Sequence, residues 1–449
     1  MIVFNNPQAS ITQLESGETL GPELFKEAIE KKILELKKES IGPGSVVLIA
    51  NPNSIHFFVN LLAIFSLGAT VVPLDPNASE LELENIKNHS GANLLIKDNK
   101  TFQFKKELNE ELKTIALVLY TSGTTGKPKG VKLSFNALRS KIETLSKFIT
   151  PDESKNTLCF LPTYFGHGLI CNSLFALFSG EHFFIASKMD LQLASAFKNL
   201  INKNKITFFS SVPSVWDLVL NFSGEDDTSL PTLKRVHCAS AYLQNEKAEV
   251  ISRWLGKNVS FYNIFGITEI SGWFAQRKFF PAEDINLFSD YFNAQTKFDL
   301  NGELLIKAPY MFSGYLADQE ETAKAIDEKG FFRTGDIFKD SHYSGRSKFV
   351  INKKGIKIYP NELDEFFLNS TMVSDCHTFP VKDEFSGELI GVLIVLKEKI
   401  TLEMFRKYCL KNLPANKFPD KIFVVPKIER TGRGKIAADS IKKYTGELK

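Results

Sequence analysis

Residues 120–130 read YTSGTTGKPKG, and no other part of the chain says as much about its fold. Hydroxyls, three glycines and two lysines stand there in one short turn after the apolar run 115–120. Glycines let the backbone approach a ligand and point amide N–H groups at it, hydroxyls donate further hydrogen bonds, and ammonium groups balance negative charge. The apolar run has the pattern of a buried strand. The stretch therefore predicts a strand leading into a loop that binds a polyphosphate.

The spacing of this loop differs from the Walker pattern of P-loop nucleotide hydrolases. Only two residues separate Gly123 from Gly126, and Pro128 stands where that pattern needs a Mg²⁺-binding Ser or Thr. A kinase or a P-loop hydrolase is therefore disfavoured. A polar surface loop without a ligand is the plainer alternative for the same residues.

Length and composition indicate two unequal domains. The chain has 449 residues, of which 43% are apolar, enough for one large core and a smaller one. A net charge of +3 gives no reason to expect a nucleic-acid partner. The lysine-rich C-terminal third favours either an acidic ligand or partner, or simply a solvated surface.

Targeting and cysteine signals point to a cytoplasmic protein. The first residues lack the basic and then apolar order of a signal peptide. Polar residues, a glycine and a proline interrupt the longest apolar stretch, 57–74, which predicts a packed helix and a strand and no transmembrane span. The cysteines are scattered without metal-site or disulfide spacing, which fits a reducing compartment: Cys159, Cys171, Cys238, Cys376 and Cys409.

The order of predicted elements is that of an α/β protein. A helix over 22–38, a strand over 46–49, a helix over 55–67 and a strand ending at 71–72 give βαβ order. Later strands are predicted at 208–212, 236–239 and 259–262, and after a Gly- and Lys-rich stretch at 349–351, 391–397 and 422–425. We expect a large N-terminal domain of layered sheets and helices, residues 1–344, and a small α+β domain, residues 345–449. Ligands of such sheets lie beyond the carboxyl ends of the strands.

Further short motifs follow the phosphate loop in a fixed order. They are NIFGITE at 263–269, FFRTGD at 331–336, Gly345-Arg346, KGIKIYPNE at 354–362 and TGRGKI at 431–436. Each is weak alone, but together with the loop they resemble the adenylate-forming superfamily, which includes acyl- and aryl-CoA ligases, adenylation domains of peptide synthetases and beetle luciferases. The resemblance runs from about residue 57 to 435 and implies the fold of these ligases, with a mobile C-terminal domain.

The resemblance also implies a role for each motif. Phosphate binding falls to Thr121, Ser122, Gly123, Thr124, Thr125, Gly126 and Lys127. Asn263 is implied to bond the adenine amine, and Phe265, beside Gly266, to stack on the base. The family usually has Tyr in place of Phe265, so a contact through that hydroxyl is lost. Thr268 and Glu269 are implied to be catalytic, with Glu269 holding Mg²⁺.

The remaining motifs are implied to serve the ribose and the small domain. Asp336 would accept hydrogen bonds from both ribose hydroxyls, and Arg346 would contact the ribose or phosphate. Lys348 matches the hinge between the domains, Gly355 the approach of the thiol, and Lys435 the catalytic lysine that stabilises charge as pyrophosphate leaves.

Substrate choice is predicted to lie in three segments around 161–169, 211–214 and 239–241. The pocket residues we expect are Phe165, His167, Ser211, Ala239, Ser240 and Ala241. Adenylation domains for amino acids have an Asp in the first segment, and its absence here makes a plain acyl or aryl acid the better expectation, because a buried ammonium group needs a partner. His167 is either a polar lining residue or a histidine satisfied within the core.

The predicted reaction joins a carboxylic acid to ATP with Mg²⁺, releases pyrophosphate, and passes the acyl group from the adenylate to coenzyme A. The nearest alternative has the same chemistry with an acyl carrier protein as acceptor. A nucleotide-binding sensor without turnover is a rival of another class, and Glu269, Asp336, Arg346 and Lys435 argue against it. A luciferase-like oxidation has no separate support.

Overall fold

The computed structural model describes residues 6, 8–104, 107–121, 129–223, 229–241, 243, 245–280, 290–339, 342–347, 350–353, 356–383, 387–430 and 441. The chain forms two compact units. Unit 1 comprises Met1–Leu243, Lys247–Gln295 and Lys307–Gly330, and unit 2 comprises Gln244–Glu246, Thr296–Ile306 and Phe331–Lys449. The predicted domain boundary between residues 344 and 345 stays a prediction.

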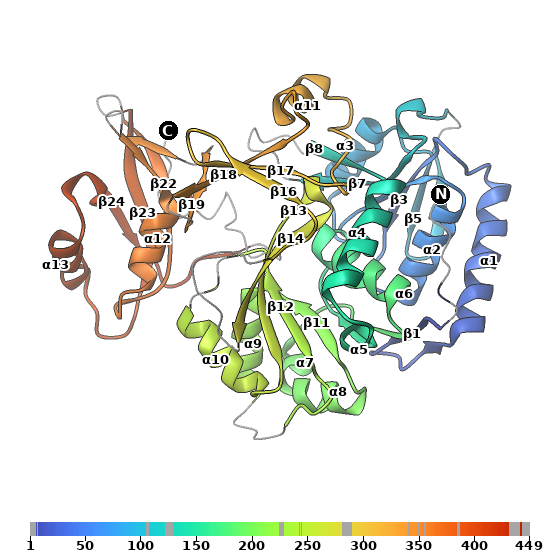
Figure 1. The fold of residues 1–449 in the computed structure, drawn as a ribbon, viewed down its shortest axis with the longest axis horizontal. Coiled ribbons are helices and arrows are strands. Elements are labelled where there is room, and N and C mark those ends of the chain that lie inside the picture. The colour runs from blue at the N-terminus through green and yellow to red at the C-terminus, as the bar shows by residue number, and fades with distance from the viewer. Residues whose placement is uncertain are drawn as a thin grey trace. The chain divides into compact units, whose positions relative to one another are not determined.

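Unit 1 contains two sheets of mainly parallel strands. The first has the order β15-β14-β13-β12-β11-β9-β10-β1-β2 among the described strands. Its strands are β1 (Ser10–Gln13), β2 (Thr19–Leu20), β9 (Asn156–Cys159), β10 (His182–Ile185), β11 (Phe208–Ser211), β12 (Arg235–Ala239), β13 (Ser260–Ile267), β14 (Gly272–Phe280) and β15 (Asp290–Tyr291). Strands β11, β12 and β13 run parallel and side by side (Figure 1), so their carboxyl ends share one edge of the sheet.

The second sheet of unit 1 has the order β6-β5-β3-β4-β7-β8. Its strands are β3 (Val46–Ala50), β4 (Thr70–Pro73), β5 (Leu94–Lys97), β6 (Lys100–Gln103), β7 (Ile115–Thr121) and β8 (Lys129–Ser134). Strand β3 pairs in parallel with β4 and β5, whereas β7 and β8 form an antiparallel pair.

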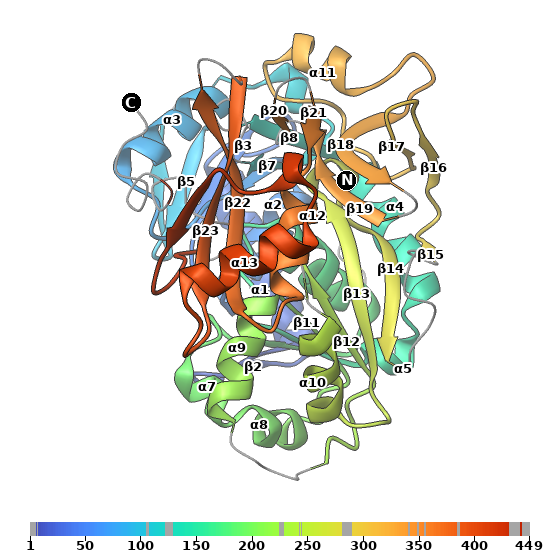
Figure 2. The same ribbon diagram turned by 90° about the vertical axis from the view of Figure 1, so that its left-hand side faces the viewer.

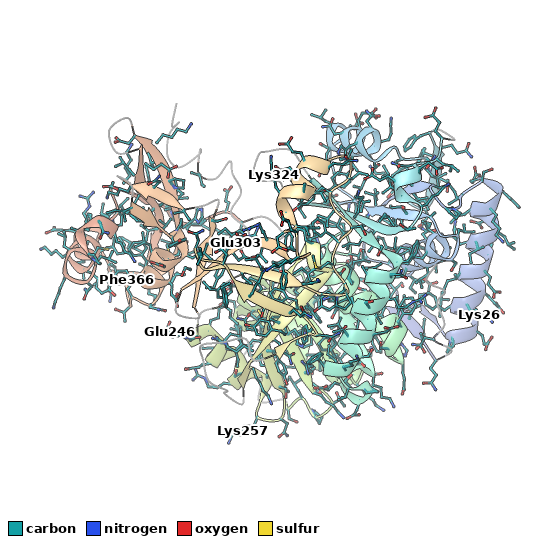
Figure 3. All side chains as sticks on the ribbon, turned by 45° about the horizontal axis from the view of Figure 1, so that its top comes forward. Lys26, Glu246, Lys257, Glu303, Lys324 and Phe366 are labelled. Atoms are coloured by element: carbon teal, nitrogen blue, oxygen red, sulfur yellow. The ribbon has the colours of Figure 1, made fainter. Side chains whose placement is uncertain are left out.

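Helices cover both sheets of unit 1. They are α1 (Pro22–Lys38), α2 (Ile55–Ser66), α3 (Glu80–Ser90), α4 (Phe135–Phe148), α5 (Pro151–Ser154), α6 (Phe175–Ser179), α7 (Leu191–Ser195), α8 (Phe197–Lys203), α9 (Pro213–Phe222), α10 (Asn245–Leu255) and α11 (Gln319–Ala325). Short turns of other helix types are η1 (Glu110–Leu112), the π-helix η2 (His167–Leu174) and η3 (Thr268–Ile270). Exposed charges such as Lys26 on α1 and Lys324 on α11 lie on the outer side of their helices (Figure 3).

Helix α2 lies between the two sheets. Ser54 caps it by accepting a hydrogen bond from the amide of Phe57, and nearly all its side chains are buried. A helix that is apolar all round must be enclosed. Accordingly α2 contacts β3 and β4 on one side and β1 on the other, and the Phe58 ring packs edge-on against Phe183 of β10. The predicted helix and strand in 57–74 are therefore confirmed. None of the helices in the described ranges combines the length and the apolar character needed to cross a membrane.

Unit 2 is built on two sheets whose strands pair mainly in antiparallel fashion. One contains β16 (Gln295–Phe298), β17 (Glu303–Lys307), β18 (Phe332–Lys339) and β19 (His342–Arg346). The other contains β20 (Ile351–Lys353), β21 (Ile356–Ile358), β22 (Val373–Asp383), β23 (Gly387–Leu396) and β24 (Lys421–Val424), together with the turn η5 (Ala415–Lys417) and the helices α12 (Pro360–Leu368) and α13 (Leu402–Asn412). In this second sheet β23 and β24 pair in parallel. Figure 2 shows α12 and α13 next to each other, where the rings of Phe367 and Phe405 lie 5.3 Å apart.

The predicted α/β class is confirmed, with one local correction. Residues 263–267 were expected to follow a strand, but they belong to β13 itself. Antiparallel pairing with β14 carries the strand on to the register pair Ile267 and Gly272, so the chain turns only at 268–271. Local composition could not reveal this partner, because β14 comes later in the chain.

Candidate active site

The base of the predicted phosphate loop is a strand pair. Thr121 at the end of β7 is in register with Lys129 at the start of β8. Gly130 follows in β8, where an added Cβ would lie 3.0 Å from Val118 and 3.2 Å from the Leu316 side chain. A side chain at Gly130 would therefore press on both of these neighbours. Among the loop residues, Thr121 is described and Ser122, Gly123, Thr124, Thr125, Gly126 and Lys127 lie outside the described residues.

The motif at 263–269 lies at the end of β13. Asn263 is in register with Cys238 of β12, and Phe265 packs its half-buried ring edge-on against Phe274 at 5.2 Å. Gly266 is exposed and faces β14 closely, since an added Cβ would lie 2.7 Å from the carbonyl oxygen of Gly272. Glycine at this position therefore lets β13 and β14 approach closely and leaves exposed backbone beside the Phe265 ring.

A chain of contacts links Glu269 to the base of the phosphate loop. The half-buried carboxylate of Glu269 accepts a hydrogen bond at 3.0 Å from the hydroxyl of Tyr315. The ammonium group of Lys129 lies 5.0 Å from the centre of the Tyr315 ring and also forms an ion pair with Glu321 of α11. Two motifs far apart in the sequence are thus adjacent within unit 1. Thr268 is half-buried in η3, where its carbonyl accepts from the amide of Ser271.

A single carboxylate in this arrangement fits Mg²⁺ held largely by a nucleotide. Within the described part of the chain, no three His, Cys, Asp or Glu residues gather in a way that could hold a metal ion by themselves. Mg²⁺ in nucleotide sites takes one or two carboxylates, and phosphate and water oxygens complete its shell. Tyr315 orients one oxygen of Glu269, which suits that role.

The predicted ribose residues form a pair within unit 2. Asp336 of β18 is opposite Arg346 of β19, and the guanidinium Nε donates to the carboxylate at 2.9 Å. Asp336 is buried, and its backbone amide donates to the hydroxyl of Thr334. Glu303 of β17, labelled in Figure 3, accepts from the amide of Gly335 at 2.9 Å. The strand pairing thus fixes the carboxylate and the arginine side by side.

His167 is held between two serine hydroxyls in unit 1. It begins the π-helix η2, a type of turn often found at functional sites. Its Nε2 lies 2.6 Å from the hydroxyl of Ser210 and its Nδ1 lies 2.9 Å from that of Ser240. Burial lowers the pKa of His167 to about 3, so the ring is neutral. Both nitrogens are satisfied, and a role in binding substrate stays a prediction.

Ser240 adopts an unusual backbone conformation for this contact. Its φ of 71° lies in the left-handed region that favours glycine. Such a residue costs about 1–2 kcal/mol of backbone strain, which the fold tolerates where the side chain serves a purpose. Here the purpose is a hydroxyl placed on His167.

The other predicted pocket residues are Ser211, Phe165, Ala239 and Ala241. Ser211 has its hydroxyl engaged, donating to the carbonyl oxygen of His237 at 2.6 Å and accepting from the indole of Trp216 at 2.9 Å. Phe165 stacks obliquely on Tyr164 with ring centres 4.3 Å apart. Ala239 is buried at the end of β12, and Ala241 is half-buried two residues on.

Sequence reasoning missed two residues of the site, and nine of the predicted residues, six of them in the phosphate loop, lie outside the described part of the chain. Ser210 meets His167 although Ser211 was the residue expected, and strand alternation in 208–211 is the signal that separates their two faces. Tyr315 had no motif to mark it. The hinge residue Lys348, the thiol-channel residue Gly355 and the catalytic candidate Lys435 lie outside the described residues.

Known proteins are similar to this chain along most of its length. The sequence pattern of the AMP-binding enzyme family matches residues 34–115 and 97–316, and that of the AMP-binding enzyme C-terminal domain matches residues 362–435. The oxalate–CoA ligase of Arabidopsis thaliana is 27% identical, and the alignment covers 88% of this chain and 87% of that protein. The 4-coumarate–CoA ligase 2 of Nicotiana tabacum is 25% identical, with 91% and 86% covered.

A solved structure shows the same fold. ATP-bound MatB from Rhodopseudomonas palustris superimposes with a TM-score of 0.84 at 19% identity, and the match covers 99% of this chain and 97% of that one. The fold predicted from the sequence motifs is therefore confirmed.

Proposed function

Because the chain belongs to the AMP-binding enzyme family, we propose that it activates a carboxylic acid with ATP and transfers the acyl group to the thiol of coenzyme A. The predicted class of enzyme, an AMP-forming acid–thiol ligase, is confirmed by the family and by the CoA ligases among its relatives.

One observation carries the proposal beyond the family. Lys129, at the base of the phosphate loop, and Glu269, at the end of β13, both contact Tyr315. A loop that binds phosphates and a carboxylate that binds Mg²⁺ must lie close together to act on one nucleotide. The contact through Tyr315 satisfies this requirement with residues of unit 1 alone.

Two displacements account for the reaction. A carboxylate oxygen of the acid attacks the α-phosphorus of ATP. The bond between the α-phosphorus and the oxygen that bridges to the β-phosphorus breaks, and pyrophosphate leaves with the electron pair of that bond. The sulfur of the thiol then attacks the acyl carbon, and AMP leaves as the thiol proton is lost. No covalent bond to the enzyme is needed, so positioning and charge stabilisation suffice.

The residues of this chain serve these displacements by position and charge. Lys127 and the hydroxyls of the phosphate loop would bind the β- and γ-phosphates, and Lys435 would bind the oxygens on which negative charge develops. Asp336 and Arg346 would bind the ribose. Glu269, oriented by Tyr315, would hold Mg²⁺, which neutralises phosphate charge when bound. Lys348 would allow the small domain to present different faces to the two half-reactions.

The surroundings of His167 favour an acid without an ammonium group. The neutral imidazole and the hydroxyls of Ser210 and Ser240 carry no negative charge to pair with one. We also propose a cytoplasmic location, since all the cysteines are buried free thiols.

The test is pyrophosphate release with ATP, Mg²⁺ and a panel of acids, with and without coenzyme A. Release that requires one acid and turns over with coenzyme A supports the proposal. A single burst that coenzyme A does not extend, but a phosphopantetheinyl carrier protein does, favours the carrier as acceptor. Glu269→Gln should lower kcat on the order of 100-fold. Glu27→Gln, an exposed carboxylate on α1, is the matched control and should change nothing.

A further inference from the structure

Two buried N–H groups beside His167 have no acceptor in the described part of the chain. They are His237 Nδ1 on β12 and Trp273 Nε1 on β14. The two side chains are 0% and 1% exposed, and their rings meet edge to face with centres 4.6 Å apart. Native proteins rarely bury a donor without an acceptor, because each such group costs about 1–3 kcal/mol. Two of them side by side indicate an acceptor that comes from outside the protein.

The proton on His237 is assigned by its neighbour. Arg235 Nε donates to His237 Nε2 at 2.7 Å, and an arginine nitrogen can only donate. Nε2 must therefore accept, which leaves the proton of the neutral ring on Nδ1. Burial and the charge of Arg235 both lower the pKa of His237, which keeps it in this form.

Arg235 is itself immobilised. Its guanidinium donates to Gln276 at 2.5 Å and to the carbonyl oxygen of Phe148 at 3.1 Å, pairs with Glu153 at 3.3 Å, and lies 4.0 Å from the centre of the Tyr262 ring. The donor on His237 is thus fixed in position before any ligand arrives, and the charge of Arg235 already has its partner.

These donors adjoin the predicted acid pocket. His237 is in register with Ser210 on the neighbouring strand β11, and Ser210 contacts His167. The Trp273 ring lies 5.5 Å from that of His167, which also contacts Ser240. The two residues that carry these N–H groups therefore lie next to His167 and Ser210 of the predicted acid pocket.

We infer that the acid substrate carries an uncharged oxygen remote from its reacting carboxyl group, and that His237 Nδ1 and Trp273 Nε1 donate hydrogen bonds to it. The inference rests on the proposed function, whose substrate class it narrows. Two donors exclude an ammonium group at this point. A second carboxylate is disfavoured because His167 and His237 are neutral and Arg235 already has its partners, so none of these three groups would neutralise a buried anion. A carbonyl, ether or hydroxyl oxygen meets the need.

Matched acids test this specificity. Each pair has one member with such an oxygen and one in which a methylene or methyl group replaces it, for example 4-methoxycinnamate with 4-ethylcinnamate and 6-oxoheptanoate with heptanoate. The ratio of kcat/KM for pyrophosphate release within the best pair should be about 10- to 100-fold in favour of the oxygenated acid. Ratios near one in every pair would overturn the inference and leave the ligase function standing.

A second measurement does not depend on turnover. The chain has three tryptophans, so ¹⁵N-labelled protein gives three indole N–H signals, which Trp→Phe variants assign. Trp216 and Trp254 donate to serine hydroxyls, at 2.9 Å in both cases. The oxygenated acid should move the Trp273 proton downfield, whereas its partner should not. If that signal ignores every acid, the acceptor is a buried water and the inference fails. If it responds although no acid releases pyrophosphate, the binding site stands and the ligase function fails.

Variants connect the two measurements. Trp273→Phe removes one donor and keeps an aromatic ring, and His237→Gln removes the N–H at Nδ1 while its longer side chain can place an amide oxygen where Nε2 accepts from Arg235. Each should reduce the ratio within the preferred pair about tenfold, without a change in KM for ATP. Trp254→Phe makes the same chemical change away from the pocket and should leave the ratio unaltered. Equal loss for both members of the pair in Trp273→Phe and His237→Gln would mean that the residues only support the fold.

Discussion

Lys141 should make unit 1 less stable at neutral pH than a methionine at the same position. Its side chain on α4 is fully buried, with the ammonium group donating to the carbonyl oxygen of Trp273 and lying 3.4 Å from the centre of the Tyr310 ring. Among the described residues no carboxylate lies within ion-pair distance of it. The titratable groups that face it are the Cys171 thiol, whose pKa burial raises to about 11, and the Tyr310 phenol, whose pKa burial also raises.

The magnitude follows from the cost of burying this charge. Burial lowers the pKa of Lys141 from 10.5 to about 7, a difference equivalent to about 5 kcal/mol. The hydrogen bond to the Trp273 carbonyl oxygen and the contact with the Tyr310 ring face offset about 3 kcal/mol of the cost of burying the charge. The methionine variant loses both interactions. Lys141→Met should therefore raise the free energy of unfolding by about 2 kcal/mol at pH 7.

The pH dependence gives the sharper test. Below pH 7 the lysine is protonated in both states, so the wild type bears the full cost. Between pH 7 and 10.5 the unfolded chain binds a proton that the folded chain has lost, and the stability of the wild type rises with pH. The wild type gains about 1.4 kcal/mol per pH unit in this window, so the advantage of Lys141→Met should vanish about 1.5 pH units above pH 7 and reverse at higher pH.

Urea unfolding followed by tryptophan fluorescence measures this, because all three tryptophans belong to unit 1. Lys147→Met, an exposed lysine on the same helix, is the control and should show no such trend. A constant difference between Lys141→Met and wild type from pH 7 to 10 would refute the reasoning, as would a less stable variant at every pH.

Two further predictions concern the reaction. Lys435→Ala should abolish adenylate formation but spare thioester formation from supplied acyl-adenylate, since its charge is needed only as pyrophosphate leaves; equal loss in both assays would contradict this role. Ser240→Gly should raise stability by about 1 kcal/mol through relief of the positive φ, and should lower kcat/KM for the acid because His167 loses a partner. Unchanged kcat/KM with raised stability would remove Ser240 from the pocket.

Much of the fold could be predicted because local patterns decide it. The helix expected at 22–38 has these bounds, with Pro22 at its first position and an apolar face around Phe25, Ile29 and Leu36. The strand predicted before the phosphate loop is β7, and the βαβ unit of β3, α2 and β4 is as expected. The end of β13 was predicted wrongly because its continuation depends on pairing with β14.

Some residues of the candidate site could be predicted from motifs, and others could be found only in the structure. Motif order indicated Glu269, Asp336 and Arg346, and the cross-strand pair of Asp336 and Arg346 agrees with a shared task. Tyr315 and the donors on His237 and Trp273 carry no motif, because each matters through neighbours that the sequence places far away.

The sequence by itself determined the class of this protein, since glycine spacing, hydroxyls and strand patterns act through the local backbone and through chemistry that each residue carries alone. The tertiary structure decided which of those residues meet. The register between β11 and β12 places Ser210 and His237 on one face of the sheet. The hydrogen bond from Arg235 to His237 Nε2 leaves the proton of the neutral ring on Nδ1, which has no acceptor among the described residues. Burial keeps the His167 and His237 rings neutral, because removing a charge from water is costly without a partner. These are properties of the packed interior, and no stretch of the chain contains them separately.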